Sequence, residues 1–246
     1  MSIHDATSQR LFVEDPLSAG ATLTISEAQA HYLVNVLRQK VGSTVLVFNG
    51  GDGEWAAELV AAKKRSAELA VVRQLRPQTD GPDIVYIFAP LKRARLDYMA
   101  QKATELGVAA LQPVLTQRTI AERVNLERLR ANAIEAAEQC GVLRVPDVRA
   151  PVKLEVLLAN WHASRAMIFC DEGATGAKPH EQLARAPTGP LAVLVGPEGG
   201  CAPAEREALL GQPFVYRLSL GPRIMRSDTA GVAALALVNA TLGDWR

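Results

Sequence analysis

The chain reads LAVLVGPEGG at residues 191–200. The first five residues are apolar without interruption, which is typical of a strand buried on both faces of a parallel sheet. The glycines that follow would let a ligand approach the backbone at the carboxyl end of that strand, where open α/β sheets bind their ligands. An ordinary tight turn explains the same pentapeptide equally well. The GxGxxG fingerprint of dinucleotide-binding proteins is absent from it.

A second glycine-containing segment reads LSLGPRIMRSDTA at residues 218–230. It again follows a predicted strand and leads into a predicted helix, for which Ser227 and Asp228 are the expected caps. Gly221 would expose backbone amides to a ligand, and three apolar side chains would form a floor that suits an adenine ring. Those three side chains are Leu220, Ile224 and Met225. Two such turns in one domain favour a ligand site over two unrelated turns.

Strands and helices alternate along the chain after residue 82. The patterns predict strands at residues 84–89, 111–115, 166–170, 191–195 and 214–218. They predict helices at residues 94–106, 125–139 and 204–210, with a last helix from about Asp228. This alternation predicts an α/β domain built around a parallel sheet that is covered on both faces.

The N-terminal part is rich in strand patterns instead, and strands are expected at residues 10–13, 44–48, 54–61 and 67–75. One helix interrupts them, because Ser26 and Gln29 can form a capping box and Gly42 would end the helix. Its predicted apolar stripe consists of Leu33, Val36 and Leu37. Residues 49–53, which read NGGDG, supply the turn that a hairpin needs. We therefore expect a small β-barrel.

The segment between these two parts reads PQTDGP at residues 77–82. It has two prolines and a glycine and no apolar period, which is typical of a linker. We therefore place the domain boundary here, with a first domain at residues 1–77 and a second at residues 82–246.

The composition excludes several classes of protein. The 246 residues are 48% hydrophobic and 22% charged, which suits a packed globular chain and argues against extensive disorder. With 27 basic and 26 acidic residues there is no general basic coat, so any contact with RNA must come from local patches. The three cysteines have no CxxC spacing, which argues against a zinc site or a disulfide framework and suits a reducing cytoplasm.

The hydropathy pattern argues against export and against membrane insertion. The N-terminus has no apolar region of the kind that a secretory signal requires. The longest apolar stretch, at residues 230–238, is far shorter than the roughly 20 residues of a membrane-spanning helix. We expect a cytoplasmic protein without a membrane segment or a bound metal.

Taken together, the segments at residues 194–200 and 218–230 resemble the two cofactor-loop motifs of the trefoil-knot SPOUT methyltransferases. Within that superfamily the chain resembles the RsmE family, the 16S ribosomal RNA uridine-N3 methyltransferases. The similarity extends through QKATELGV at 101–108, EQCG at 138–141 and HYLVNVLR at 31–38, and so covers nearly the whole chain. The departures at Cys201, Met225 and Asp228 are mild. The segment TQRT at 116–119 replaces the more usual acidic-Arg-Ser sequence of the family, which keeps Arg118 but changes its neighbours.

The resemblance implies a PUA-like RNA-binding β-barrel followed by a C-terminal α/β domain with a trefoil knot. It implies a homodimer that binds S-adenosylmethionine and acts on 16S ribosomal RNA of the small ribosomal subunit. The positions that match the cofactor-contacting residues of the family are Leu194, Val195, Gly196, Pro197, Glu198, Gly199, Gly200, Leu218, Leu220, Gly221, Ile224, Met225, Arg226 and Thr229.

The predicted reaction requires the N3 atom of uridine to lose its proton before it can attack a methyl group. Arg226 and Arg118 are the candidates for stabilising the resulting negative charge, although Arg226 can also be an ordinary surface arginine. Glu198 can act as the general base or can accept backbone amides within its own turn. The candidate RNA-binding residues are Arg10, Arg38, Lys40, Lys92, Arg93 and Arg95.

Three alternatives differ in chemistry. The first is another SPOUT reaction, methylation of a ribose 2′-hydroxyl or of a transfer RNA base. The second is an RNA-binding ribosome assembly factor that keeps the knotted scaffold but has no turnover. The third, a nicotinamide-dependent oxidoreductase, is disfavoured because the glycine fingerprint is missing.

Overall fold

A computed structural model describes residues 9–63, 65–120, 123–174 and 178–246 of the chain. The chain divides into two compact units. The first comprises residues 1–79 together with 138–144, and the second comprises residues 80–137 and 145–246. The sequence suggested two continuous ranges, and nothing in its pattern indicated that residues 138–144 group with the N-terminal unit.

The N-terminal unit is built on a five-stranded sheet with the order β1-β3-β4-β5-β2. Its strands are β1 (Arg10–Phe12), β2 (Thr22–Ile25), β3 (Thr44–Phe48), β4 (Glu54–Ala62) and β5 (Ala67–Arg76). Neighbouring strands are antiparallel except for β1 and β3, which are parallel. Alternate side chains of these strands form one core, which includes Leu11, Leu23, Val45, Val47, Leu59 and Leu69. The four predicted strands are confirmed, and β2 was not anticipated.

The predicted hairpin turn connects β3 to β4. The side-chain oxygen of Asn49 accepts the backbone N–H groups of Gly51 and Asp52 at 3.0 and 2.8 Å. Gly53 has a φ of +81°, and a Cβ there would collide with the backbone carbonyl of Arg76. This position therefore requires glycine.

The N-terminal helix begins as predicted and ends differently. Ser26 caps α1 (Glu27–His31) in the expected capping box with Gln29. The chain then continues as the π-helical segment η1 (Tyr32–Val36), in which hydrogen bonds span five residues and the helical period changes. As a result Val36 is 56% exposed and does not belong to the apolar stripe. The segment ends at Leu37, so the expectation that Gly42 ends the helix is wrong.

The side chains of Arg10 and Arg76 bind residues 138–144 to the rest of the N-terminal unit. Both guanidinium groups contact the carboxylate of Glu54, whose side chain is 6% exposed, at 2.7 and 2.8 Å. Arg10 also donates to the backbone carbonyl of Glu138 at 2.9 Å, and Arg76 binds a carbonyl of the same segment. Burial acts to raise the pKa of Glu54, but the hydrogen bonds from the two arginines outweigh it and the pKa is lowered.

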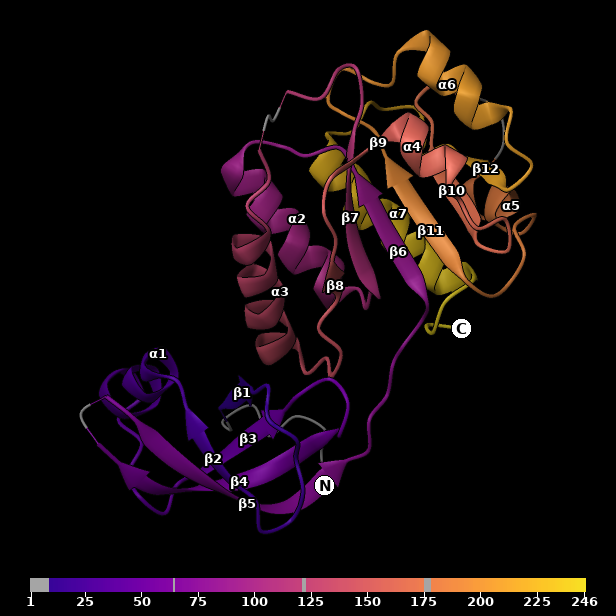
Figure 1. The fold of residues 1–246 in the computed structure, drawn as a ribbon. Helices are drawn as coiled ribbons and strands as arrows, with labels where there is room; N and C mark the ends of the chain where they lie inside the picture. The colour runs from indigo at the N-terminus through magenta and orange to yellow at the C-terminus, as the bar shows by residue number, and fades with distance from the viewer. Residues whose placement is uncertain (1–8, 64, 121–122, 175–177) are drawn as a thin grey trace. The chain divides into compact units, whose positions relative to one another are not determined.

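The C-terminal unit contains a parallel sheet with the order β12-β10-β11-β6-β7-β8, and β9 also pairs with β7 (Figure 1). Its strands are β6 (Ile84–Phe88), β7 (Ala110–Leu115), β8 (Asp147–Val148), β9 (Val152–Lys153), β10 (Ala166–Cys170), β11 (Leu191–Val195) and β12 (Val215–Leu218). Each pair is parallel, as predicted.

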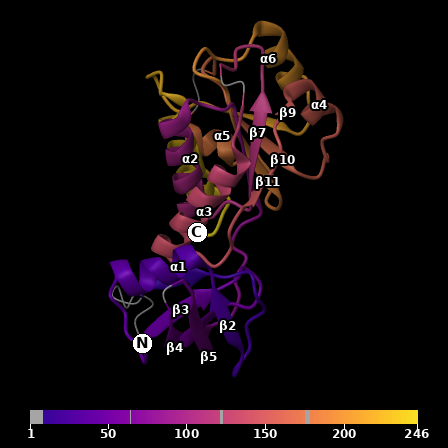
Figure 2. The ribbon, with the colours of Figure 1, turned by 60° about the vertical axis from the view of Figure 1, so that its left-hand side comes forward.

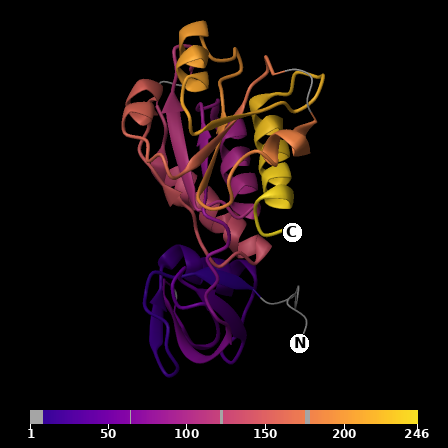
Figure 3. The same cartoon turned by 90° about the vertical axis from the view of Figure 1, so that its right-hand side faces the viewer.

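Helices cover both faces of this sheet (Figures 1 and 3). Side chains of α2 (Arg93–Glu105), α3 (Leu126–Cys140), α5 (Pro179–Leu183) and α7 (Ser227–Thr241) pack on one face. Figure 2 shows α2 and α3 side by side. Side chains of α4 (Leu154–Ala159) and α6 (Pro203–Leu210) pack on the other face. The central strands β6, β10 and β11 carry almost only apolar side chains because both of their faces are buried.

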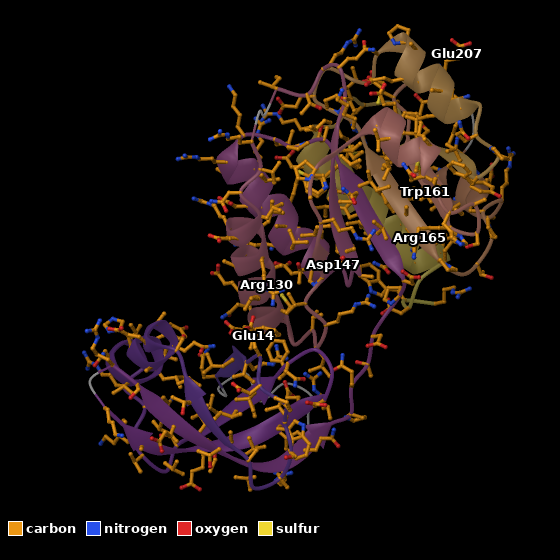
Figure 4. All side chains as sticks on the ribbon, viewed as in Figure 1. Glu14, Arg130, Asp147, Trp161, Arg165 and Glu207 are labelled. Atoms are coloured by element: carbon orange, nitrogen blue, oxygen red, sulfur yellow. The ribbon has the colours of Figure 1, made fainter. Side chains whose placement is uncertain are left out.

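Trp161 packs against the core on the face of the sheet that α4 covers (Figure 4). Its ring stacks on Phe214 with 5.9 Å between centroids, and its indole N–H donates to the backbone carbonyl of Arg165 at 2.9 Å. The segment between β9 and β10, for which no element was predicted, is therefore part of the packed layer. Among the helices that the structure describes, none has the length and apolar character needed to cross a membrane.

The strand register places the two glycine-containing turns at one edge of the sheet. Val195, the last residue of β11, pairs with Cys170, the last residue of β10. Cys170 also pairs with Leu218, the last residue of β12. The turns that follow β11 and β12 therefore begin at the same level, with the end of β10 between them.

Candidate functional site

An open cleft lies where the turns after β10, β11 and β12 meet. Its empty volume is about 860 Å³, which includes the open mouth. It is lined by residues 169–172, 195–197, 200–201, 206, 218–225, 227 and 230. The cleft thus lies at the carboxyl ends of parallel strands, where ligands of such sheets bind.

A side-chain hydrogen bond joins the two glycine-containing turns. The hydroxyl of Ser227, which is only 6% exposed, donates to the backbone carbonyl of Gly196 at 3.1 Å. The expectation that Ser227 caps α7 is wrong, because the cap position is occupied by Arg226 and has no side-chain hydrogen bond. Asp228 lies in the first turn, where its carboxylate accepts the N–H of Thr229 at 2.9 Å. Ser227 is buried against the turn after β11, so its side chain holds the two turns together and does not cap the helix.

The turn after β11 is both tight and part of the cleft. The N–H of Gly200 donates to the carbonyl of Pro197 at 2.9 Å, and Gly200 has a φ of +69°. A Cβ on Gly200 would collide with the carboxylate of Glu172. The sequence left open whether residues 196–200 form an ordinary tight turn or a turn that lines a ligand site. The two interpretations are compatible, because this tight turn also lines the cleft.

Most of the predicted cofactor residues line the cleft, and these are Val195, Gly196, Pro197, Gly200, Leu218, Leu220, Gly221, Ile224 and Met225. Ile224 is 90% exposed at the cleft, so its apolar surface is open to a ligand. Leu194 is instead buried in the core that α4 and α6 cover. Glu198, Gly199, Arg226 and Thr229 belong to the same two turns but do not line the cleft.

The sequence did not point to two acidic residues at the end of β10. Asp171 is 2% exposed and accepts hydrogen bonds from Arg206 and Arg217 at 2.9 and 2.8 Å. Burial acts to raise its pKa, but the hydrogen bond from Arg206 and the other contacts lower it. Glu172 is exposed at the cleft and accepts no hydrogen bond among the described residues. Polar residues that follow a buried strand were the available signal.

The two cysteines of the cleft are not nucleophiles. Burial raises the pKa of both the Cys170 and the Cys201 thiols to about 12. Both groups therefore stay protonated at neutral pH. Among the residues that the structure describes, no cluster of three histidine, cysteine or acidic side chains could hold a metal ion.

Arg95 connects the two turns from a third element. Its guanidinium forms an ion pair with Glu198 of the turn after β11, and its Nε lies 3.8 Å from the carboxylate of Asp228 at the start of α7. Glu198 thus accepts from an arginine side chain and not from the amides of its own turn. Arg95 was predicted to bind RNA, and its geometry favours a positioning role at this cleft.

The structure also brings Arg118 to the turn after β11. Arg118 follows β7, yet its guanidinium donates to the backbone carbonyl of Gly199 at 2.7 Å. A local turn holds it there, because the N–H of Thr116 donates to the hydroxyl of Thr119 at 2.8 Å. Arg226, in contrast, is exposed at the start of α7.

The remaining predicted RNA-binding residues differ in exposure. Arg38 and Lys40 are exposed in the N-terminal unit, and Lys92 and Arg93 are exposed in the C-terminal unit. Arg10 is only 10% exposed, and its donors are directed at Glu54 and at backbone carbonyls. The prediction that Arg10 binds RNA therefore lacks support, because its charge is neutralised inside the protein.

Comparisons with known proteins agree with this site. Residues 79–239 match the family model of an RNA methyltransferase domain, and residues 25–72 match that of an RNA methyltransferase PUA domain. Ribosomal RNA small subunit methyltransferase E from Synechocystis sp. is 32% identical over 95% of this chain and 78% of its own length. The protein of that name from Mycobacterium bovis is 30% identical over 96% of this chain and 93% of its own.

A solved structure of a protein with the same name is also similar to this chain in fold. The crystal structure of ribosomal RNA small subunit methyltransferase E from Neisseria gonorrhoeae, bound to S-adenosyl methionine, is 28% identical in sequence. It superposes with a TM-score of 0.85 and covers 97% of this chain and 100% of that chain.

Proposed function

This chain belongs to the ribosomal RNA small subunit methyltransferase E family of RNA methyltransferases, and we propose that its two glycine-containing turns together bind the methyl donor. The protein is an S-adenosylmethionine-dependent methyltransferase of 16S ribosomal RNA. Its fold class is the one that the sequence predicted, a PUA-type domain followed by an α/β domain of the trefoil-knot SPOUT superfamily.

The residues of the cleft fit S-adenosylmethionine. Leu220, Ile224 and Met225 provide apolar surface for an adenine ring. Nothing lies within 4 Å of the position that a Cβ on Gly221 would take, so a ligand can approach the backbone there. Glu172 offers a carboxylate for ribose hydroxyls or for the amino group of the donor. When bound, the donor supplies an electrophilic methyl group on a sulfonium.

The observation that carries the proposal is the joining of the two turns. The shared register of β10, β11 and β12 brings the turns to one edge, and the bond from Ser227 to Gly196 fixes one against the other. A site that holds the donor methyl group and the acceptor atom in line can lower a reaction barrier by about 7 to 11 kcal/mol.

The target atom is, we propose, N3 of a uridine. That atom carries a proton and becomes a good nucleophile only when the proton leaves. We assign Glu198 as the general base that accepts the proton, with Arg95 positioning its carboxylate. Arg226 and Arg118 would stabilise the negative charge that develops on the uracil carbonyl oxygens. Arg118 is already held at the turn by the carbonyl of Gly199.

The contacts with RNA and the assembly are also proposals. We assign RNA contacts to four exposed cations, which are Arg38, Lys40, Lys92 and Arg93. The family resemblance supports a homodimer in the cytoplasm. Sedimentation at low concentration tests the assembly, and a single monomeric species would contradict it.

Titration calorimetry with S-adenosylmethionine tests the cofactor site. We expect the wild-type protein to bind one equivalent, and we expect Ile224→Asn to bind about tenfold more weakly because apolar contact is lost. Ile120→Asn is the matched control, because Ile120 is also an exposed isoleucine, with 66% of its surface accessible, but does not line the cleft. Failure of the wild-type protein both to bind the donor and to transfer methyl groups would favour the assembly-factor alternative.

A further inference from the structure

A second cleft lies in the C-terminal unit, beside the first turn of α2. Its empty volume is about 1550 Å³, the open mouth included. It is lined by Leu91, Lys92, Arg93, Leu96, Asp97, Arg123, Val124, Asn125, Arg128 and Leu129. We call it the α2 cleft. None of these residues lines the cofactor cleft.

The charges of the α2 cleft are not balanced. Asp97 binds the guanidinium of Arg128 at 2.6 and 2.8 Å, and this hydrogen bonding lowers the pKa of Asp97. These two residues therefore neutralise one another. Arg93 also acts electrostatically on Asp97, so Asp97 is the one anion facing four cations of the cleft lining. Among the described residues, the side chains of Lys92, Arg93 and Arg123 form no hydrogen bond or ion pair within the distance of a direct contact. Three available cations around one cleft are suited to a polyanion.

The start of α2 adds to this positive potential. The cap residue of this 13-residue helix is Lys92, and within the described part of the chain no side-chain hydrogen bond caps the first turn. No acidic side chain lies in that turn either. The N–H groups and the helix dipole therefore favour an anion at the place where the three cations gather.

The floor of the α2 cleft is apolar. Leu91, Leu96 and Leu129 are 7%, 9% and 2% exposed, and they form part of the main core. A cleft with an apolar floor and a cationic rim is suited to a nucleotide, with its phosphate at the rim and its base or ribose against the floor.

Arg95 connects the α2 cleft to the cofactor cleft. It lies in the same helical turn as Arg93 and Leu96, which line the α2 cleft. Its own side chain forms the ion pair with Glu198, in the turn that lines the cofactor cleft. The first turn of α2 therefore contacts both clefts.

We propose that the α2 cleft binds a phosphodiester of the substrate RNA, close in the strand to the nucleotide that receives the methyl group. This inference rests on the proposed function. It assigns Arg123 to RNA binding, a role that the sequence did not suggest, and it gives Lys92 and Arg93 a defined site. One nucleotide would occupy the α2 cleft while its neighbour presents the target atom at the donor.

The test uses the full-length protein and a protein-free fragment of 16S ribosomal RNA. Lys92→Gln and Arg123→Gln are compared with Arg185→Gln, which removes an exposed arginine outside both clefts. We expect each cleft variant to raise the KM for RNA about tenfold, with a smaller change in kcat. We expect each to lower the slope of log affinity against log salt concentration by about 1. The Kd for S-adenosylmethionine and the thermal midpoint should equal those of the control.

Two results separate the inference from the proposed function. If the wild-type protein transfers methyl groups but both cleft variants keep its KM and its salt slope, the α2 cleft does not bind RNA. If the wild-type protein transfers no methyl groups to the fragment or to small ribosomal subunits, the proposed function itself fails; if it acts on subunits alone, the same variants are compared on subunits. Arg123→Lys should restore most of the affinity, because the contact depends on positive charge.

Discussion

At the scale of single residues, the arginines of this chain differ in role because their partners differ. Arg10 is enclosed by Glu54 and backbone carbonyls, so its charge serves the N-terminal unit. Arg95 is committed to Glu198 and thereby positions a turn of the cofactor site. Arg226 is exposed at the start of α7, so its charge is available to a ligand.

Arg226→Ala should lower methyl transfer by about 100-fold or more, because loss of one preorganised donor has effects of that order. The fold should be retained, with unfolding free energy within about 0.5 kcal/mol of the wild-type value, since an exposed side chain adds little to stability. Steady-state kinetics and thermal unfolding measure the two quantities. Arg185→Ala is the control, and unchanged turnover of Arg226→Ala would refute the assignment.

At the scale of elements, continuous apolar runs were the most informative part of the sequence. They located β10 and β11 to the residue, because strands buried on both faces need no polar side chains. The capping box at Ser26 was also readable, since all of its atoms belong to neighbouring residues. Short elements such as α5 were missed, because five residues are too few to show a helical period.

Features that depend on distant contacts could not be predicted. Ser227 has the residue type and position of a cap, but its partner is a carbonyl 31 residues earlier in the chain. The π-helical turn at Tyr32–Val36 replaced the ordinary helical period on which the expected stripe was based. In the same way, the motifs indicated a donor site at two turns, while the sheet register shows that Glu172, which follows a third strand, lines the same cleft.

The packing of α7 on β6 gives a prediction at this scale. A Cβ on Gly231 of α7 would collide with the hydroxyl of Tyr86, which is buried and has no hydrogen-bond partner among the described residues. Gly231→Ala should therefore destabilise the protein by about 1 to 3 kcal/mol, although alanine is the better helix former. Urea unfolding measures this change.

The same substitution made together with Tyr86→Phe is the control. Removal of a buried hydroxyl that has no partner should be neutral or stabilising by itself. It also removes the colliding oxygen, so Gly231→Ala should cost much less in this background. An equal loss of stability in both backgrounds would contradict the account.

At the scale of the whole molecule, the basic and acidic residues nearly balance, so local clusters of charged side chains determine the electrostatic contributions to stability and binding. In the N-terminal unit the main such group is the buried cluster of Glu54, Arg10 and Arg76, which also binds residues 138–144. In the C-terminal unit the first turn of α2 contacts two clefts, which we propose to bind the methyl donor and a phosphodiester of the RNA.

The cluster predicts a dependence of stability on pH. The pKa of Glu54 is lowered in the folded state, so the unfolded state binds more protons as the pH falls below about 4.5. The contribution of Glu54 is therefore complete above that pH and is lost as the pH decreases through the lowered pKa. Glu54→Gln should be less stable at neutral pH and should lose this part of the pH dependence.

Glu58→Gln is the matched control, because Glu58 lies on the same strand and is exposed. Thermal unfolding between pH 3 and 7 compares the variants. If the thermal midpoints of the wild-type protein and of Glu54→Gln change in parallel with pH, the ionisation of Glu54 does not contribute to the pH dependence of stability.

The central claim, that the two joined turns present a methyl donor to a uridine of ribosomal RNA, has one direct test. Small ribosomal subunits from cells that lack the protein are incubated with it and with labelled S-adenosylmethionine, and the labelled nucleoside is then mapped. We expect a single N3-methyluridine in 16S ribosomal RNA. Label on a ribose hydroxyl or on another base, or no label at all, would contradict it.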